Sequence, residues 1–307
     1  MKAYIAIPTY NGGSIWEESA QKIREYAPVG TYVQIIDSGS KDNTVSIAKK
    51  YEFDVVHIDA KNFNHGGTRN LLVELHKDEF EIVIFLTQDA IPEPNFFEKI
   101  TGVFSNAKIA CAYGRQLPHY DANAISQHAR YFNYKEDSYI SKFDDIPLMG
   151  LKTVFSSNSF SAYRISTFLE LNGFPKNTIL SEDMHYAAKS VLAGYSIAYV
   201  SDSIVRHSHN YNCIEEFKRY FDIGVFHADE SWIRKKFGGA GGEGKKFIYS
   251  EFIFLLKNSP LSIPKSILHN SFKILGYKLG QHYKYLPKKI VKNLSMHKKF
   301  WSEERII

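Results

Sequence analysis

The chain has 307 residues, of which 44% are hydrophobic and 23% charged, proportions that indicate a globular protein with one full core and exclude a disordered or fibrous chain. The net charge of +5 combines −5 over residues 1–244 with +10 from Lys245 onward, where thirteen basic residues stand against three acidic ones. The two cysteines, Cys111 and Cys213, lie far apart and outside any CxxC pattern, which argues against a disulfide framework or a zinc site.

The first half of the chain alternates short β-branched or aromatic runs with segments that carry apolar residues at helical spacing. This alternation is typical of a parallel sheet flanked by helices. Because the N-terminal residues run directly into the first strand-like segment, we expect no signal peptide. The predicted strands are Ala3–Ile7, Tyr32–Ile36, Asp54–Ile58, Ile82–Leu86 and Ile109–Tyr113, and the predicted helices are Ile15–Tyr26, Thr44–Tyr51 and Thr68–Leu75.

Polar residues follow three of these strands directly. In a sheet of this kind the ligand-binding loops follow the carboxyl ends of the strands, so we expect a ligand site there. The residues concerned are Pro8, Thr9, Tyr10 and Asn11 after the first strand, Asp37 and Ser38 after the second, and Gln88 and Asp89 after the fourth.

The middle of the chain is less regular. Residues 116–150 are rich in Tyr, His and Asp, and we interpret them as an insertion. Two more strands are predicted over Thr153–Ser157 and Ile197–Val200, with a helix over Asp183–Ala193 between them.

The C-terminal part interleaves lysines with aromatic and aliphatic residues, as in Phe272–Leu279. This pattern predicts basic amphipathic helices that lie on an anionic membrane surface. The longest apolar runs, Ile82–Leu86 and Phe252–Leu256, are too short to span a bilayer. Nucleic acid is the alternative anionic partner, but we expect no nucleic-acid binding because no motif for it is present.

Five motifs occur in order over roughly residues 3–210: Pro8–Asn11, Asp37–Thr44, Gly66–Asn70, Gln88–Ala90 and Glu182–Asp183. Together they resemble family 2 of the inverting glycosyltransferases. The resemblance implies a GT-A fold, a Rossmann-like α/β structure with a mixed sheet flanked by helices, over residues 1–240. A basic helical extension would follow over residues 241–307.

Further segments resemble bacterial rhamnosyltransferases within that family. They are Phe63–Asn70, Leu86–Ala90, His207–Tyr211 and Gly276–Gly280. The resemblance implies transfer of L-rhamnose from dTDP-L-rhamnose to a lipid-linked glycan acceptor, at the inner face of the cytoplasmic membrane. The alternatives are a family 2 transferase with a UDP-sugar donor and a non-catalytic membrane scaffold for glycan assembly.

The resemblance also implies which residues bind the nucleotide-sugar donor. Asp37 would accept the imide N–H of the base, or alternatively open the loop or cap a turn. Arg69 and free backbone N–H groups would meet the diphosphate, unless Arg69 is a surface residue of a glycine-started helix. The full donor set is Pro8, Thr9, Tyr10, Asn11, Asp37, Ser38, Gly66, Gly67, Arg69, Gln88 and Asp89.

A divalent cation, Mg²⁺ or Mn²⁺, is the cofactor that the resemblance implies. It would stabilise the negative charge that develops on the leaving diphosphate. Asp89 would bind it, although the family usually has Asp-x-Asp where this chain has Thr87-Gln88-Asp89. We expect His207 to complete the site, with His209 as the other candidate. A helix cap at Asp89 and a metal-free histidine pair remain the structural alternatives.

Inversion requires a carboxylate that takes the proton from the attacking acceptor hydroxyl. By resemblance, Asp183 has this role, and Glu182 orients the acceptor or supports the metal shell. The structural alternative for both residues is simple capping of a helix. Arg115, Gln116 and Asn158 are predicted to contact sugar hydroxyls.

Overall fold

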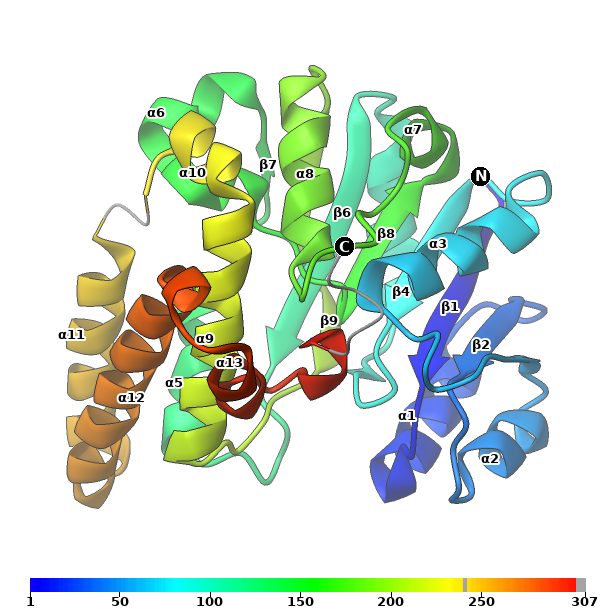
Figure 1. The fold of residues 1–307 in the computed structure, drawn as a ribbon. Helices are drawn as coiled ribbons and strands as arrows, with labels where there is room; N and C mark the ends of the chain where they lie inside the picture. Colours follow the sequence, from blue (N-terminus) through cyan, green and yellow to red (C-terminus); the bar gives the residue numbers. More distant parts are fainter. Residues whose placement is uncertain (240–241, 302–307) are drawn as a thin grey trace.

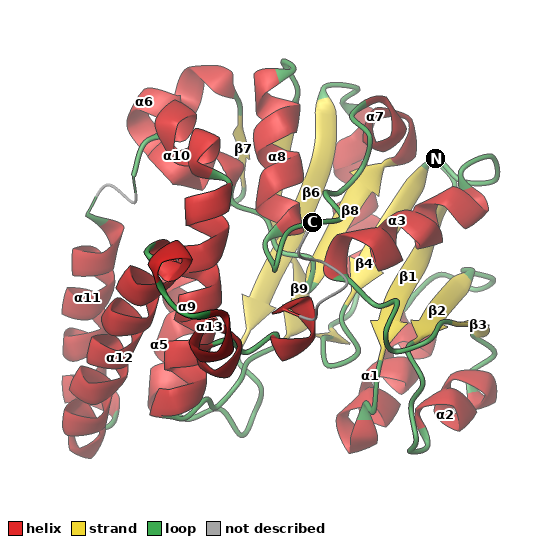
Figure 2. Ribbon diagram, viewed as in Figure 1, coloured by secondary structure: helices red, strands yellow, loops and turns green. Residues whose placement is uncertain are grey.

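The computed structural model describes residues 1–239 and 242–301. Figures 1 and 2 show a central sheet with helices on both faces. Along the sheet the strand order is β3-β2-β1-β4-β8-β6-β9-β5, and β7 pairs with β9. The strands are β1 (Ala3–Thr9), β2 (Val33–Asp37), β3 (Asp54–His57), β4 (Ile82–Leu86), β5 (Ile91–Pro92), β6 (Ile109–Leu117), β7 (Tyr139–Ser141), β8 (Phe160–Arg164) and β9 (Ser196–Arg206).

Thirteen α-helices lie in the part of the chain that the structure describes. They are α1 (Gly13–Tyr26), α2 (Thr44–Lys50), α3 (His65–His76), α4 (Phe96–Gly102), α5 (Ala124–Asn133), α6 (Ile146–Met149), α7 (Ile165–Glu170), α8 (Glu182–Leu192), α9 (Cys213–Asp229), α10 (Ser231–Phe237), α11 (Glu243–Asn258), α12 (Ile263–Gln281) and α13 (Lys288–Leu294).

The sheet is mixed. β1 is parallel to β2 and β4, and β2 is parallel to β3, as the alternating pattern predicts. β8 is antiparallel to both β4 and β6. This arrangement of a mixed sheet between helices confirms the predicted fold class.

Helices bury both faces of the sheet. Trp16 of α1 and Phe96 of α4 belong to the core on one face, and Leu72 of α3 and Tyr186 of α8 belong to the core on the other. β2 and β4 are buried at every position. A strand covered on both sides is expected to be largely apolar. β4 is apolar throughout, while β2 also contains the buried polar residues Gln34 and Asp37.

The strand predicted over Thr153–Ser157 is wrong. These residues form the end of a 3-10 turn, Gly150–Val154, and the loop after it, and the strand of this region is β8. Val154 is nevertheless buried. A short run of apolar residues in a core has the same sequence pattern whether it forms a strand or a loop, which explains the wrong prediction. The insertion predicted as irregular contains a regular helix, α5, and the short strand β7.

After β9 the described chain is helical, beginning with α9. The boundary predicted after residue 240 falls at residues 240–241, which lie outside the described residues. α12 packs closely along α9. A Cβ atom on Gly276 would lie 2.3 Å from the carbonyl oxygen of Phe217, so glycine is needed at that contact. Within the described residues, no helix combines the length and hydropathy needed to cross a bilayer.

Candidate functional site

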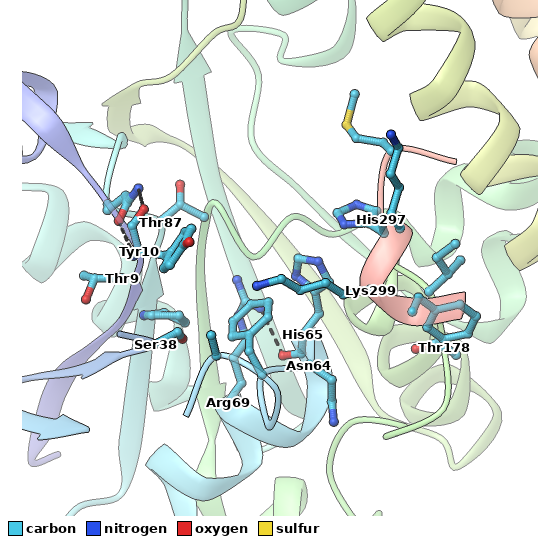
Figure 3. Close-up of a pocket in the computed structure, with 18 of the residues that line it drawn as sticks. Thr9, Tyr10, Ser38, Asn64, His65, Arg69, Thr87, Thr178, His297 and Lys299 are labelled. Carbon is cyan, nitrogen blue, oxygen red and sulfur yellow. Dashed lines mark hydrogen bonds between the residues drawn. The ribbon is translucent and has the colours of Figure 1, made fainter. Parts of the chain in front are cut away.

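A cavity of about 630 Å³ opens where β1, β2 and β4 end. One wall comes from the loops after these strands and from the start of α3, and the opposite wall comes from the C-terminal segment, residues 296–300 (Figure 3). Seven of the predicted donor residues line it: Pro8, Thr9, Tyr10, Ser38, Arg69, Gln88 and Asp89. Asn11, Asp37, Gly66 and Gly67 are outside this lining.

Gln88 braces the loop that carries Tyr10. Its side-chain oxygen accepts the Tyr10 N–H at 2.8 Å, and its amide group donates to the Tyr10 carbonyl at 3.1 Å. Asn11 makes a similar link, because its side-chain oxygen accepts the Lys41 N–H at 2.8 Å. These bonds tie the loops after β1, β2 and β4 to one another. Gln88 and Asn11 therefore shape the cavity wall.

Asp37 is buried beneath that wall and closes its own loop. One carboxylate oxygen accepts the N–H groups of Gly39 and Ser40, and the other accepts the hydroxyls of Thr9 and Ser40. These bonds match the turn-capping alternative of the sequence interpretation. Ser38, the next residue, lines the cavity instead. Recognition of a base by Asp37 stays a prediction.

The two glycines at the start of α3 serve packing. Asn64 caps this helix by accepting the Gly67 N–H. A Cβ atom on Gly66 would lie 2.1 Å from the carbonyl oxygen of Pro175, so the helix can approach that loop only with glycine here. Arg69 is almost completely buried and pairs with Glu182 at 3.1 Å, so it is not the surface arginine of the structural alternative.

Asp89, His207 and His209 form the one cluster of His, Cys, Asp and Glu ligand atoms suited to a metal ion among the described residues. The Nε2 atoms of His207 and His209 lie 3.4 and 3.6 Å from the same Asp89 oxygen. Burial, and next the proximity of His207, lower the pKa of His209 to about 3, which leaves its ring neutral and able to bind a cation. The donor set of one carboxylate and two imidazoles fits a divalent ion.

A buried chain of hydrogen bonds behind His207 selects its tautomer. The side-chain oxygen of Gln116 accepts from Arg130 at 2.9 Å and lies 2.9 Å from Nδ1 of His207. Because an arginine can only donate, this oxygen is an acceptor and Nδ1 carries the proton. With Nδ1 engaged by Gln116, Nε2 is the ring nitrogen that faces Asp89. Gln116 is thus placed behind the candidate metal site rather than at an open sugar-binding surface.

Glu182 and Asp183 are adjacent carboxylates at the start of α8, with opposite electrostatic environments. Burial would raise the pKa of Glu182, but Arg69 and His65 hold it below its usual value. Burial and then the charge of Glu182 raise the pKa of Asp183. Two neighbouring acids whose pKa values are pushed apart are typical of a site that transfers protons.

Asn158 holds this acid pair in place. Its backbone N–H donates to Asp183 at 2.9 Å, and its side-chain amide donates to Glu182 at 2.8 Å. Its oxygen accepts from Ser161 and Tyr163, which leaves the buried side chain fully engaged. Arg115 pairs with exposed Glu136 at 3.1 Å and is outside the cavity lining.

The sequence interpretation missed Arg130 and the C-terminal segment. Arg130 lies in the part interpreted as an irregular insertion, and the C-terminal segment was assigned to a membrane-directed tail because of its lysines. The helical pattern ends after Leu294, which is compatible with a chain that turns back toward the sheet. This signal alone does not predict that the segment contacts the cavity. Only the packing of distant elements reveals these contributions.

Comparisons with known proteins identify the family of the chain. Residues 4–171 match the family described as Glycosyl transferase family 2. The chain is 50% identical over 304 residues to O-antigen chain rhamnosyltransferase RfbN of Salmonella typhimurium, with 98% of this chain and 96% of that protein covered. It is 48% identical over 300 residues to O-antigen chain rhamnosyltransferase WbaN of Salmonella anatum, with 97% and 95% covered.

Solved structures share the fold at low sequence identity. The mannosyltransferase PcManGT from Pyrobaculum calidifontis, in complex with GDP-Man and Mn²⁺, is 16% identical with a TM-score of 0.56, covering 98% of this chain and 84% of that one. TarS of S. aureus, in complex with UDP-GlcNAc, is 18% identical with a TM-score of 0.53, covering 96% and 84%. These likenesses concern the fold alone.

Proposed function

The chain belongs to glycosyl transferase family 2, and on that premise we propose that it is an inverting enzyme that transfers L-rhamnose from dTDP-L-rhamnose to a lipid-linked polysaccharide intermediate. The observation that carries the proposal is a single cavity whose lining joins the nucleotide-facing loops to the Asp89 cluster and, through Arg69, to the Glu182 and Asp183 pair. The rhamnosyltransferase names of the two Salmonella relatives support rhamnose as the sugar.

The loops after β1 and β2 would hold the nucleotide. Tyr10, whose backbone is fixed by Gln88, offers its ring to the base, while Ser38 and Thr9 lie on the same wall. The sugar would extend toward Arg69 and the acid pair. Because Arg69 is paired with Glu182, it supports the acids rather than presenting an unpaired charge to the diphosphate.

Asp89, His207 and His209 would hold Mg²⁺ or Mn²⁺, and this ion would neutralise the charge that develops on the leaving diphosphate. Two imidazoles beside one carboxylate favour Mn²⁺, because Mg²⁺ prefers oxygen ligands. The protonated Nδ1 of His207, held by Gln116, keeps the other ring nitrogen available as a ligand.

Asp183 is the general base of the proposed reaction. It accepts the proton of an acceptor hydroxyl, whose oxygen attacks the anomeric carbon of the sugar. The bond from that carbon to the diphosphate oxygen breaks in the same displacement, dTDP leaves with the bonding electrons, and the configuration inverts. Asn158 and Arg69 hold the two carboxylates in position for this transfer.

The exposed side chains of α11 and α12 favour the proposal that the acceptor is membrane-bound. Exposed apolar side chains gather on both helices: Ile248, Tyr249, Phe252, Ile253 and Leu256 on α11, and Ile267, Leu268, Ile274 and Leu275 on α12. Exposed lysines such as Lys257 and Lys265 lie on the same two helices. An apolar surface with lysines suits an anionic bilayer. We therefore infer a peripheral location on the inner face of the cytoplasmic membrane.

A thermal-shift experiment tests the donor. With Mn²⁺ present, dTDP-L-rhamnose should stabilise the protein more than UDP sugars do, because only a bound ligand raises the free energy of unfolding. Asp89→Asn should abolish the part of the shift that depends on Mn²⁺. A larger shift with a UDP sugar would favour the alternative family 2 transferase.

A transfer assay tests the reaction itself. Asp183→Asn should lower rhamnose transfer by about 10²–10⁴-fold, the usual contribution of a general base, while it retains the donor-induced shift. Full activity in this variant would overturn the role of Asp183. A wild-type protein that binds neither nucleotide nor metal would instead support the non-catalytic scaffold.

A further inference from the structure

The C-terminal segment, residues 296–300, forms a wall of the cavity although it is more than 200 residues away in sequence from the loops opposite. Figure 3 shows Lys299 extending from this segment across the cavity toward Tyr10. Its Nζ atom lies 5.3 Å from the centre of the Tyr10 ring. The ring of His297 packs edge-on against His65 at the start of α3, with their centres 4.9 Å apart.

The segment is held by a buried carboxylate of α9. Asp222 is fully buried, and one of its oxygens accepts the N–H groups of Met296 at 2.9 Å and His297 at 3.1 Å. Ser295 and Val291, which precede the segment, are also buried. These contacts fix the backbone from which Lys299 projects, so its approach to the cavity is built into the fold.

The basic residues of the cavity lining indicate what kind of ligand the C-terminal segment can bind. Arg69 also lines the cavity and pairs with buried Glu182. Burial and the neighbouring His65 lower the pKa of His297 to about 3, so its ring is neutral. Lys298 and Lys299 are the other lysine or arginine residues in the lining. A nucleotide-sugar donor brings two negative phosphates, which a lysine ammonium stabilises by charge-assisted hydrogen bonds.

We propose that Lys299 binds the diphosphate of the donor and that Asp222 is the positioning residue that holds Lys299 in place. This inference rests on the proposed function, because it takes a nucleoside diphosphate as the ligand of the cavity. It assigns the C-terminal segment to the donor site rather than to the membrane-directed surface of α11 and α12. The donor then lies between two walls, with its base against Tyr10 and its phosphates between Lys299 and the Asp89 cluster.

The test measures Kd by calorimetry for dTDP, UDP and thymidine, with Mn²⁺ and the full-length protein. Lys299→Met should weaken the binding of dTDP and of UDP by about tenfold or more, since a hydrogen bond to a charged group is lost. Binding of thymidine, which has no phosphate, should change less than about twofold by the same argument. Lys299→Arg should restore most of the diphosphate affinity because it keeps the charge.

Lys289→Met is the matched control, because Lys289 is an exposed lysine of α13 that does not line the cavity. It should leave all three affinities unchanged. Equal effects of Lys299→Met and Lys289→Met on dTDP would overturn the proposal. An equal loss for thymidine and dTDP would also overturn it, since Lys299 would then act through Tyr10 and the base.

Asp222→Asn tests the positioning role by a double-mutant cycle with Lys299→Met. If Asp222 acts through Lys299, the loss in dTDP affinity for the double variant should be smaller than the sum of the two single losses. Additive losses would show that Asp222 acts elsewhere. Tighter binding of UDP than of dTDP would contradict the proposed donor, yet the effect of Lys299→Met on UDP would still decide the role of Lys299.

Discussion

At the scale of single residues, the site depends on side chains that hold other side chains. Gln116 sets the tautomer of His207, Gln88 fixes the backbone of Tyr10, and Asn158 bonds to both acids of α8. Each is an amide, which can donate and accept at the same time and so connects groups of different character. A substitution to the corresponding acid would supply only acceptors and break half of these contacts.

The electrostatic contrast between Glu182 and Asp183 predicts the pH dependence of transfer. Asp183 is active as a base when deprotonated, and its raised pKa means that activity is lost as the pH falls through that raised value. The acid limb of kcat/KM should therefore have its midpoint well above the ordinary carboxyl pKa of about 3.9. A pH–rate profile between pH 4 and 9 measures it, with about five points per limb enough to place the midpoint.

Glu182→Gln provides the comparison for this profile. It removes the negative charge that raises the pKa of Asp183, so any residual activity should show an acid limb at lower pH than the wild type. A limb that stays in place, or moves upward, would mean that another group controls the profile.

At the scale of secondary-structure elements, close backbone contacts explain two glycine-containing motifs. Gly66 lets α3 approach Pro175, while Gly276 and Gly280 let α12 approach the carbonyl groups of Phe217 and Phe221 on α9. These glycines belong to segments that resemble the rhamnosyltransferases. Their common role is therefore to allow backbone to approach backbone.

Gly276→Ala should destabilise the protein by about 1–3 kcal/mol, because the added methyl group would meet a carbonyl oxygen that cannot move alone. The melting temperature in a calorimetric scan should fall by several degrees. Gly244→Ala is the control, since a Cβ atom there has open space around it and alanine favours a helix. Equal melting temperatures for the two variants would contradict the close contact of α12 with α9.

At the scale of the whole molecule, the proposed donor cavity and the apolar surface of α11 and α12 lie in different parts of the fold (Figure 1). α9 connects them, because it packs against α12 on one side and holds the C-terminal segment through Asp222. This separation is compatible with the proposed binding of a soluble donor at the cavity while α11 and α12 contact a membrane.

Binding to vesicles tests the membrane-facing surface. The wild-type protein should sediment with vesicles of anionic phospholipid, and less so as salt rises, because lysines contribute to binding. The double variant Phe252→Glu and Ile274→Glu should lose most of this binding, since it places charges among exposed apolar side chains. Leu192→Glu, at an exposed leucine of α8, is the control. Equal sedimentation of both variants would contradict the proposed surface.

Much of the catalytic half could be predicted from the sequence by itself. β1, β2 and β4 are mostly buried and mostly apolar, and the polar residues at and after their ends mark the edge where ligands bind in such sheets. Family resemblance led us to propose Asp89 and His207, with His209 as the other candidate, and the structure brings the ligand atoms of all three within 4.8 Å of one another. The basic and apolar character of α11 and α12 was also evident from composition.

Only the tertiary structure decided what depends on contacts between distant residues. Three features depend on such contacts. They are the loop that replaces the predicted strand near Val154, the hydrogen bonds from Arg130 through Gln116 to His207, and the approach of Lys299 to Tyr10. The spacing of apolar residues along the chain indicates which segments are helical and which are extended. It therefore predicted the class of fold and the region of the site. Which side chains meet across the cavity is set by the packing of whole elements, and that packing places part of the lysine-rich C-terminal region in the cavity wall.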